Sequence, residues 1–203
     1  LSSIFFGKST TGIAFLDLST GEFYVAEGDD VYVDKLISNL QPKEIVFQRG
    51  YEERFNDSFG SKHYTYRLDE WVFSESVNRD KLCRQLGVQS LKGFGIETMT
   101  AGISAAGAIL YYLEFTEHHN TAHISSIQRI DRNDAVWIDR FTTRNLELFA
   151  SNSTTARCSF TETIDRTLTP MGGRQLRRWV AMPLLDIDKI SRRQDVVEKI
   201  VTE

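Results

Sequence analysis

The stretch from residue 12 to residue 23, GIAFLDLSTGEF, constrains the fold of this chain more than any other segment. Apolar residues alternate with the period of a β-strand on both sides of Ser19, Thr20 and Gly21, which supply turn chemistry. Gly21 can adopt a positive φ without steric cost, as a tight turn between two strands requires. We therefore predict a β-hairpin, and with it a sheet to which neighbouring segments pair.

The segments around this hairpin predict alternating strands and helices. A strand is expected near residues 3–6, and residues 31–40 carry apolar side chains at helical spacing, with Asp30 as the expected N-cap and Pro42 beyond the end. The apolar run 44–47 follows at once, and a strand after a helix favours a parallel partner in a mixed sheet. A short helix at 51–59 and an edge strand at 63–68 complete this expectation of an α/β domain.

Helical patterns return at residues 71–87, closed by Gly87, and most strongly at residues 98–114. In the second helix, apolar residues recur at helical spacing while glycine and alanine occupy much of the remaining surface, so it must pack closely against its neighbours. The polar stretch 117–124 then changes composition and contains three histidines. We place a domain boundary there, at about residue 120.

Beyond the boundary the chain is expected to be helical in the main. A brief buried extended piece is predicted at 137–138, a short helix at 140–149 and a Ser/Thr-rich loop at 150–158. Thr169 is the expected N-cap of the next helix, with Pro170 at its first position. Pro183 ends that helix, and Asp186 begins the final one, whose pattern runs to the end of the sequence.

Composition narrows the functional classes. With a net charge of -4, the 203-residue chain has no overall attraction to nucleic acid. No apolar run approaches the ~20 residues that span a bilayer, so we expect no membrane association and a cytoplasmic location. Cys83 and Cys158 lie far apart, which argues against a disulfide framework. Because the chain begins at Leu1 and ends inside a helical pattern, we expect it to be a piece of a longer protein.

Asp17, inside the hairpin, raises the question of catalysis. A first-strand Asp in this order of elements resembles the start of a ribonuclease-H-like domain, in which it binds Mg²⁺ for phosphodiester cleavage. Two-metal chemistry needs further converging carboxylates; the candidates Glu44, Asp69 and Glu70 do not end a clear central strand. We favour Asp17 as an acceptor that stabilises the turn. A metal-dependent nuclease is the alternative function.

The histidines His118, His119 and His123 could ligate zinc, but adjacent histidines point to different faces of a helix and no ligand-spaced Cys or carboxylate accompanies them. A solvated helix end is the preferred interpretation. The sequence also contains no GxxxxGK[ST] nucleotide-binding loop.

Three arginines, Arg174, Arg177 and Arg178, line one edge of the helix that follows Thr169. They could contact DNA phosphates, or pair with acids such as Asp165 or Asp139. The acidic composition favours the ion pairs.

Read together, six segments resemble the MutS family of DNA mismatch-repair ATPases over essentially the whole chain. They are GIAFLDLSTGEF (12–23), LKGFGIE (91–97), AAGAILYYL (105–113), HISSI (123–127), DRFTTRNLEL (139–148) and IDRTLTPMGGRQLRRWVAMPL (164–184).

The resemblance implies that residues 1–118 are a connector domain, a ribonuclease-H-like α/β fold without nuclease activity. It implies that residues 119–203 are the beginning of the all-α core or lever domain. The mismatch-reading domain, the DNA clamp and the ATPase of the family are absent from the chain. We therefore expect no enzymatic activity and no cofactor here, with ATP and Mg belonging to the full-length parent.

In this family the connector relays conformational change between the mismatch and nucleotide sites and offers surface to the partner protein MutL. The helix that matches the partner-facing surface carries Asp80, Lys81 and Arg84, which we expect to be exposed and to contact MutL; a solvated helix face is the alternative. Mismatched duplex DNA and a second MutS subunit would be partners of the parent. A stand-alone adaptor module is a third possibility.

Overall fold

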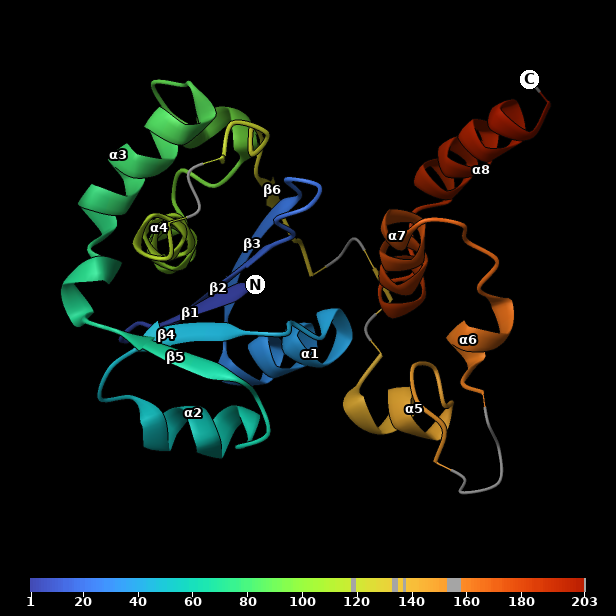
Figure 1. The fold of residues 1–203 in the computed structure, drawn as a ribbon, viewed down its shortest axis with the longest axis horizontal. Coiled ribbons are helices and arrows are strands. Elements are labelled where there is room, and N and C mark those ends of the chain that lie inside the picture. The colour runs from blue at the N-terminus through green and yellow to red at the C-terminus, as the bar shows by residue number, and fades with distance from the viewer. Residues whose placement is uncertain (118–119, 133–134, 137, 153–157, 203) are drawn as a thin grey trace. The chain divides into compact units, whose positions relative to one another are not determined.

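The computed structural model describes residues 1–117, 120–132, 135–136, 138–152 and 158–202. The chain divides into two compact units (Figure 1), the first formed by Leu1–Ile37 and Gln41–Ile130 and the second by Ser38–Leu40 and Asp131–Glu203. Each unit is described by itself below.

The first unit is built on a mixed six-stranded sheet of order β5-β4-β1-β2-β3-β6 (Figure 1). The strands are β1 (Ser2–Phe6), β2 (Thr11–Leu16), β3 (Phe23–Gly28), β4 (Ile45–Gln48), β5 (Thr65–Leu68) and β6 (Gln128–Arg129). β1, β2 and β3 pair antiparallel, whereas β4 lies parallel to β1, β5 parallel to β4, and β6 parallel to β3. The predicted hairpin, the parallel partner after the first helix and the edge strand are confirmed.

The turn of the hairpin is closed by hydrogen bonds around Asp17. Its backbone N–H donates to the Glu22 carbonyl at 3.0 Å, and its carbonyl accepts from the Gly21 N–H at 2.9 Å. Gly21 has a φ of 74°, the left-handed conformation that the turn was predicted to need. The Asp17 Oδ1 accepts from the Ser19 N–H at 2.9 Å, so the turn-stabilising role of this carboxylate is confirmed.

Helices cover both faces of the sheet, which explains why every residue of β2 is buried. On one face lie α1 (Asp30–Leu40) and α2 (Glu52–Phe59), where the Phe47 ring of β4 stacks on Phe55 at 4.5 Å. On the other face lies α4 (Thr100–Phe115), with α3 (Glu75–Leu86) packed on its outer side (Figure 1).

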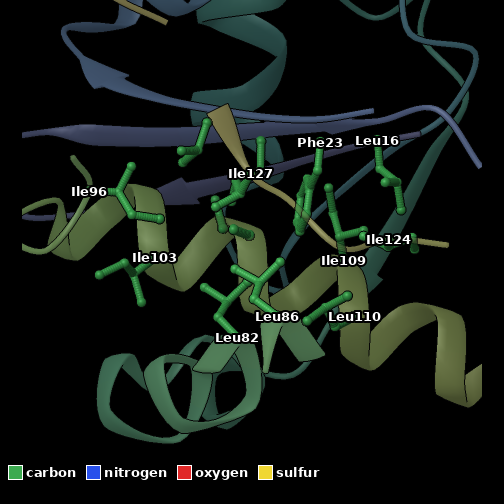
Figure 2. Packing of buried hydrophobic residues seen from close by; sticks show 14 of the residues in the cluster. Leu16, Phe23, Leu82, Leu86, Ile96, Ile103, Ile109, Leu110, Ile124 and Ile127 are labelled. Carbon is green, nitrogen blue, oxygen red and sulfur yellow. The ribbon is translucent and has the colours of Figure 1, made fainter. Parts of the chain in front are cut away.

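The main core lies between the sheet, α4 and α3 (Figure 2). Phe23 from the sheet, Ile103 from α4 and Leu82 from α3 are all fully buried in this cluster. A Cβ built on Gly12 of β2 would lie 2.0 Å from the Ala101 carbonyl oxygen of α4, and one on Gly107 would meet the Asn78 side chain at 2.3 Å. The small residues thus let α4 approach both neighbours, as its composition predicted.

The start of α1 differs from the prediction. Asp29, not Asp30, is the N-cap, and its Oδ1 accepts from the Tyr32 N–H at 2.7 Å. Asp30 is the first helical residue, and its carboxylate pairs with Arg54 of α2 at 3.2 Å. Asp29 and Asp30 are adjacent and either carboxylate can cap a helix. Asp30 pairs with Arg54 of α2, and Asp29 serves as the cap.

The predicted helix over residues 71–87 is broken in two. A 3₁₀ turn, η1 (Glu70–Phe73), precedes α3, and Ser74 separates them. Gly87 ends α3 with a φ of 66°, as predicted, and a second 3₁₀ turn, η2 (Leu91–Phe94), leads toward α4.

The segment after α4 returns to the sheet. Ile124 and Ile127 are buried in the core of the first unit, and β6 pairs with β3. The His123 ring nitrogen Nε2 lies 2.7 Å from the Leu18 carbonyl, so this histidine contacts the hairpin turn. His118 and His119 lie outside the described residues. The domain limits 1–118 and 119–203 stay a prediction.

The second unit contains α5 (Arg140–Asn145), α6 (Phe160–Ile164), α7 (Pro170–Ala181) and α8 (Ile187–Thr202). α5 is shorter than predicted because the chain turns at Glu147, whose φ is 49°. α6 was not predicted, although Ser159 and Glu162 form a capping box at its start. Of the predicted extended piece, Trp137 lies outside the described residues.

The remaining helix starts of the second unit follow the sequence. The Thr169 hydroxyl accepts from the Gly172 N–H at 3.1 Å, with Pro170 at the first position of α7. The Asp186 carboxylate accepts from the Asp188 N–H at 2.8 Å at the start of α8. In the part of the chain that the structure describes, no helix has the length and apolar character to cross a membrane.

Candidate functional site

The outer surface of α3 carries two of the three residues predicted to contact a partner. Asp80 and Arg84 are exposed and lie one helical turn apart. The Arg84 Nε donates to the Asp80 backbone carbonyl at 3.3 Å, which leaves the Asp80 carboxylate facing solvent. This pair therefore presents one negative and one positive group on the same helix face.

Lys81, the third predicted residue, is not exposed as expected. Its side chain is only 16% exposed, and its Nζ lies 2.7 Å from the Glu114 Oε2 on α4. The ammonium also lies 5.3 Å from the centre of the Tyr111 ring. The expectation was wrong because α3 packs along α4, so that the aliphatic stem of Lys81 covers its neighbour while the charged end finds a partner there.

A pocket of about 690 Å³ lies beside the exposed pair. It is lined by Arg79, Asp80, Cys83, Arg84, Gly87, Val88, Gln89, Ser90, Leu91 and Glu97. The lining residues come from α3 between Arg79 and Arg84, from the turn at Gly87 and from the segment before α4. The helix end at Gly87 thus shapes the pocket by turning the chain back along α3.

An ion-pair network fixes one wall of this pocket. Arg79 pairs with Glu75 at 2.6 Å and with Glu97 at 2.9 Å. The Glu97 carboxylate also accepts from the Leu91 N–H at 2.9 Å, which ties the loop to the helix. Arg79 thus holds two carboxylates in place, whereas Asp80 and Arg84 stand exposed on the same helix.

Sequence reasoning missed Glu97 and Leu91 as parts of this surface, and it missed the ion pairs of Arg79. The four-residue spacing of Glu75 and Arg79 signals a helical ion pair, but nothing local indicates that Glu97, 18 residues further on, joins it. The pocket offers charged groups, backbone groups and the partly buried Cys83 thiol.

The three arginines of α7 were predicted either to bind phosphate or to pair with acids. Hydrogen bonds from Thr167 hold the pKa of Asp165 below its ordinary value, and the nearby charge of Arg177 lowers it further. Arg178 donates to the Gln175 Oε1 at 2.6 Å. Arg174 and Arg177 are exposed. Arg177 is therefore close enough to interact electrostatically with Asp165, one of the two acids that the sequence suggested as partners.

Two of the carboxylates considered for a metal site, Glu44 and Asp69, are engaged by other side chains. Glu44 accepts from the Tyr112 hydroxyl at 2.8 Å, and Asp69 pairs with Arg49 at 3.3 Å. Within residues 1–117, 120–132, 135–136, 138–152 and 158–202, no three His, Cys, Asp or Glu side chains are grouped so that they could hold a metal ion.

The α/β unit with its tightly packed helix pair, followed by a helical unit, defines a chain of two linked modules. Family models agree: the model of MutS domain II matches residues 1–125, and that of MutS domain III matches residues 141–203. The chain belongs to the MutS family of DNA mismatch-repair proteins.

Curated relatives extend this finding over the full sequence. The chain is 48% identical over 203 residues to a DNA mismatch repair protein MutS of Phocaeicola vulgatus, covering 100% of the chain and 23% of the relative. It is 50% identical over 198 residues to the Bacteroides fragilis protein of that name, covering 98% and 23%. The Flavobacterium psychrophilum protein is 46% identical over 197 residues, with 97% and 23% covered. The chain thus spans about a quarter of the length of these relatives.

Proposed function

We propose that this chain is a non-catalytic middle portion of a MutS-type mismatch-repair protein, consisting of a ribonuclease-H-like connector and the beginning of an all-α lever. The family matches support the two parts, since domain II covers β1 to β5 and helices α1 to α4, and domain III runs from the first turn of α5 through α8. In the parent, ATP with Mg, mismatched duplex DNA and a second MutS subunit would engage other domains. Nothing favours the nuclease alternative, which we do not propose.

The connector transmits conformational change through α4. This helix is buried along most of its length and contacts the sheet on one side and α3 on the other. Because Gly12 has no side chain, β2 packs directly on the α4 backbone at Ala101. Because Gly107 has none, the Asn78 side chain of α3 packs directly on α4. Because closely packed elements move as rigid bodies and not by gradual deformation, a displacement of the sheet is passed on to α3.

MutL docks on the outer surface of α3, at Asp80, Arg84 and the pocket beside them. The single observation that carries this part is the exposed, oppositely charged pair at the rim of a pocket of about 690 Å³ whose wall is held by the Arg79 ion pairs. An ordered wall lowers the cost of fixing side chains when a partner binds.

The test is a charge swap in the full-length parent. Asp80→Arg combined with Arg84→Asp preserves net charge, and we expect it to weaken MutL binding at least about tenfold, as loss of an interface hot spot does. Mismatch binding by the same variant should be unchanged, because neither residue holds the core.

A matched control is available on another surface of the first unit. Asp57→Lys combined with Lys62→Asp also exchanges two exposed opposite charges, here at the end of α2 and just beyond it. This control should bind MutL like the unchanged protein. If the α3 swap leaves MutL binding intact, or if both swaps weaken it equally, the docking proposal fails.

A further inference from the structure

Aromatic rings form a continuous chain on the surface of the first unit, away from the lining of the α3 pocket. Trp71 of η1 meets the Tyr111 ring edge-on at 5.2 Å, and Tyr111 stacks on Phe115 at 6.4 Å. Phe115 in turn lies 6.1 Å from Tyr66 of β5, which lies 5.3 Å from Tyr112. We call Tyr66, Trp71, Tyr111 and Phe115 the aromatic patch.

The members of the aromatic patch are unusually accessible for large rings. Trp71 is 62% exposed, Phe115 56% and Tyr66 39%, while Tyr111 is partly buried. Tyr64, two residues before Tyr66 and therefore on the same side of the chain, is 73% exposed. Soluble proteins rarely leave contiguous aromatic surface uncovered, and such patches mark interaction sites.

The charges around the aromatic patch are mostly negative. Glu114 and Glu117 are exposed at the end of α4, and Glu70 is exposed beside Trp71. The carboxylate of Glu44 accepts a hydrogen bond from the Tyr112 hydroxyl at 2.8 Å. Lys81 reaches the patch, and Glu114 neutralises it.

The arginines near the patch are also engaged by acids. Arg49 pairs with Asp69 at 3.3 Å. Arg67 pairs with Glu52 of α2 at 3.5 Å, and so points to the opposite face of the sheet from its neighbour in β5, Tyr66. The aromatic patch therefore combines ring faces with a surplus of negative charge.

We propose that the aromatic patch binds a segment of a partner protein that presents apolar side chains together with arginine or lysine. Ring faces attract guanidinium and ammonium groups through their quadrupoles, and carboxylates at the rim add ion pairs. The apolar side chains of the segment would cover Trp71 and Phe115. This site does not depend on the proposed docking of MutL.

Charge decides against two other occupants. A second copy of this chain would bring a second set of Glu70 and Glu117 carboxylates against the first, and like charges repel. Single-stranded nucleic acid stacks on aromatic rings, but proteins that bind it surround those rings with positive charge. The rim of the aromatic patch has the opposite sign.

The test is a peptide titration of the 203-residue chain, followed by the indole N–H resonance of Trp71. A short capped peptide of alternating leucine and arginine is the probe, with leucine–glutamate and serine–arginine peptides of equal length for comparison. We expect saturable binding of the leucine–arginine peptide, at least about tenfold tighter than either comparison peptide.

Variants locate the binding. Tyr111→Ser with Phe115→Ser should weaken leucine–arginine binding at least about tenfold, whereas Phe141→Ser, which removes a ring that is 79% exposed on α5, should not change it. Glu70→Gln leaves the rings in place and should weaken binding about two- to fivefold, the size of an exposed ion pair.

Four results would overturn the proposal. They are equal affinity for the leucine–glutamate peptide, unchanged binding by the double serine variant, self-association of the chain that the double variant abolishes, and displacement of the peptide by a single-stranded oligothymidylate.

Discussion

Gly12 is the position at which one added methyl group should do most damage, and the size of the effect follows from the structure. A Cβ at this position of β2 would lie 2.0 Å from the Ala101 carbonyl oxygen and 2.7 Å from the Gly102 nitrogen, both of the α4 backbone. Real Cβ contacts are not shorter than 3.0 Å, so the first separation must grow by at least 3.0 - 2.0 = 1.0 Å. Neither partner is a side chain that can rotate away, so α4 itself must shift.

Overpacking of a core costs about 1–3 kcal/mol, and here the backbone partners place the cost near the upper end. Replacing glycine with alanine also restricts the unfolded chain, which offsets about 0.4–1 kcal/mol. We therefore expect Gly12→Ala to lower the free energy of unfolding by about 2–3 kcal/mol. For a chain of this size, that corresponds to a Tm lower by roughly 4–12 °C.

Gly93→Ala is the matched control, since it adds the same methyl group where no atom lies within 4 Å and φ is not positive. It should leave stability unchanged or raise it by up to about 1 kcal/mol. The assay is urea unfolding followed by Trp71 fluorescence in a Trp137→Phe, Trp179→Phe background, so that the first unit is observed. A loss below about 0.5 kcal/mol in Gly12→Ala, or equal effects of both variants, would refute the reasoning.

Three further outcomes are expected. Asn78→Ala should destabilise the first unit by about 2–4 kcal/mol in the same assay, because it removes two buried hydrogen bonds, to the carbonyls of Val72 and Ser104, from a side chain that is 1% exposed; an unchanged urea midpoint would contradict this. Burial, together with the hydrogen bond to Glu44, raises the pKa of Tyr112. Stability from the neutral hydroxyl is therefore complete below the ordinary value of 10.0 and is lost at higher pH; Tyr112→Phe should reduce that alkaline loss in unfolding measured across pH. Thr169→Ala should cost about 1 kcal/mol in the stability of the second unit by removing the N-cap of α7, measured by hydrogen exchange of the first-turn amides, while Thr169→Ser should retain it.

Much of the local structure could be predicted because its causes are local. The hairpin needs strand alternation and a glycine with positive φ, and both lie within a dozen residues. The starts of α7 and α8 follow from acceptors at Thr169 and Asp186 that bond to N–H groups two or three residues on. The close packing of α4 followed from its glycines and alanines, since a helix without large side chains has to approach its neighbours.

The candidate site could be predicted only in part. The charges of Asp80 and Arg84 and their shared helix face can be read from spacing. The burial of Lys81 could not, because its partner Glu114 is 33 residues away on another helix. The Arg79 ion pair with Glu97 and the return of residues 128–129 to the edge of the sheet depend in the same way on distant segments.

The sequence by itself thus determined most of the helices and strands of this MutS-family chain, α6 and β6 excepted, and the resemblance that identifies the family, because periodicity, caps and turns act over a few residues. Only the tertiary structure decided which charged groups remain free on α3. It also brought Tyr66, Trp71 and Phe115, from three separate elements, into one exposed patch. The physical reason is that the exposure and pairing of a side chain depend on which surfaces come into contact when the helices pack on the sheet. Those contacts join residues far apart in the sequence, so a local sequence pattern does not predict them.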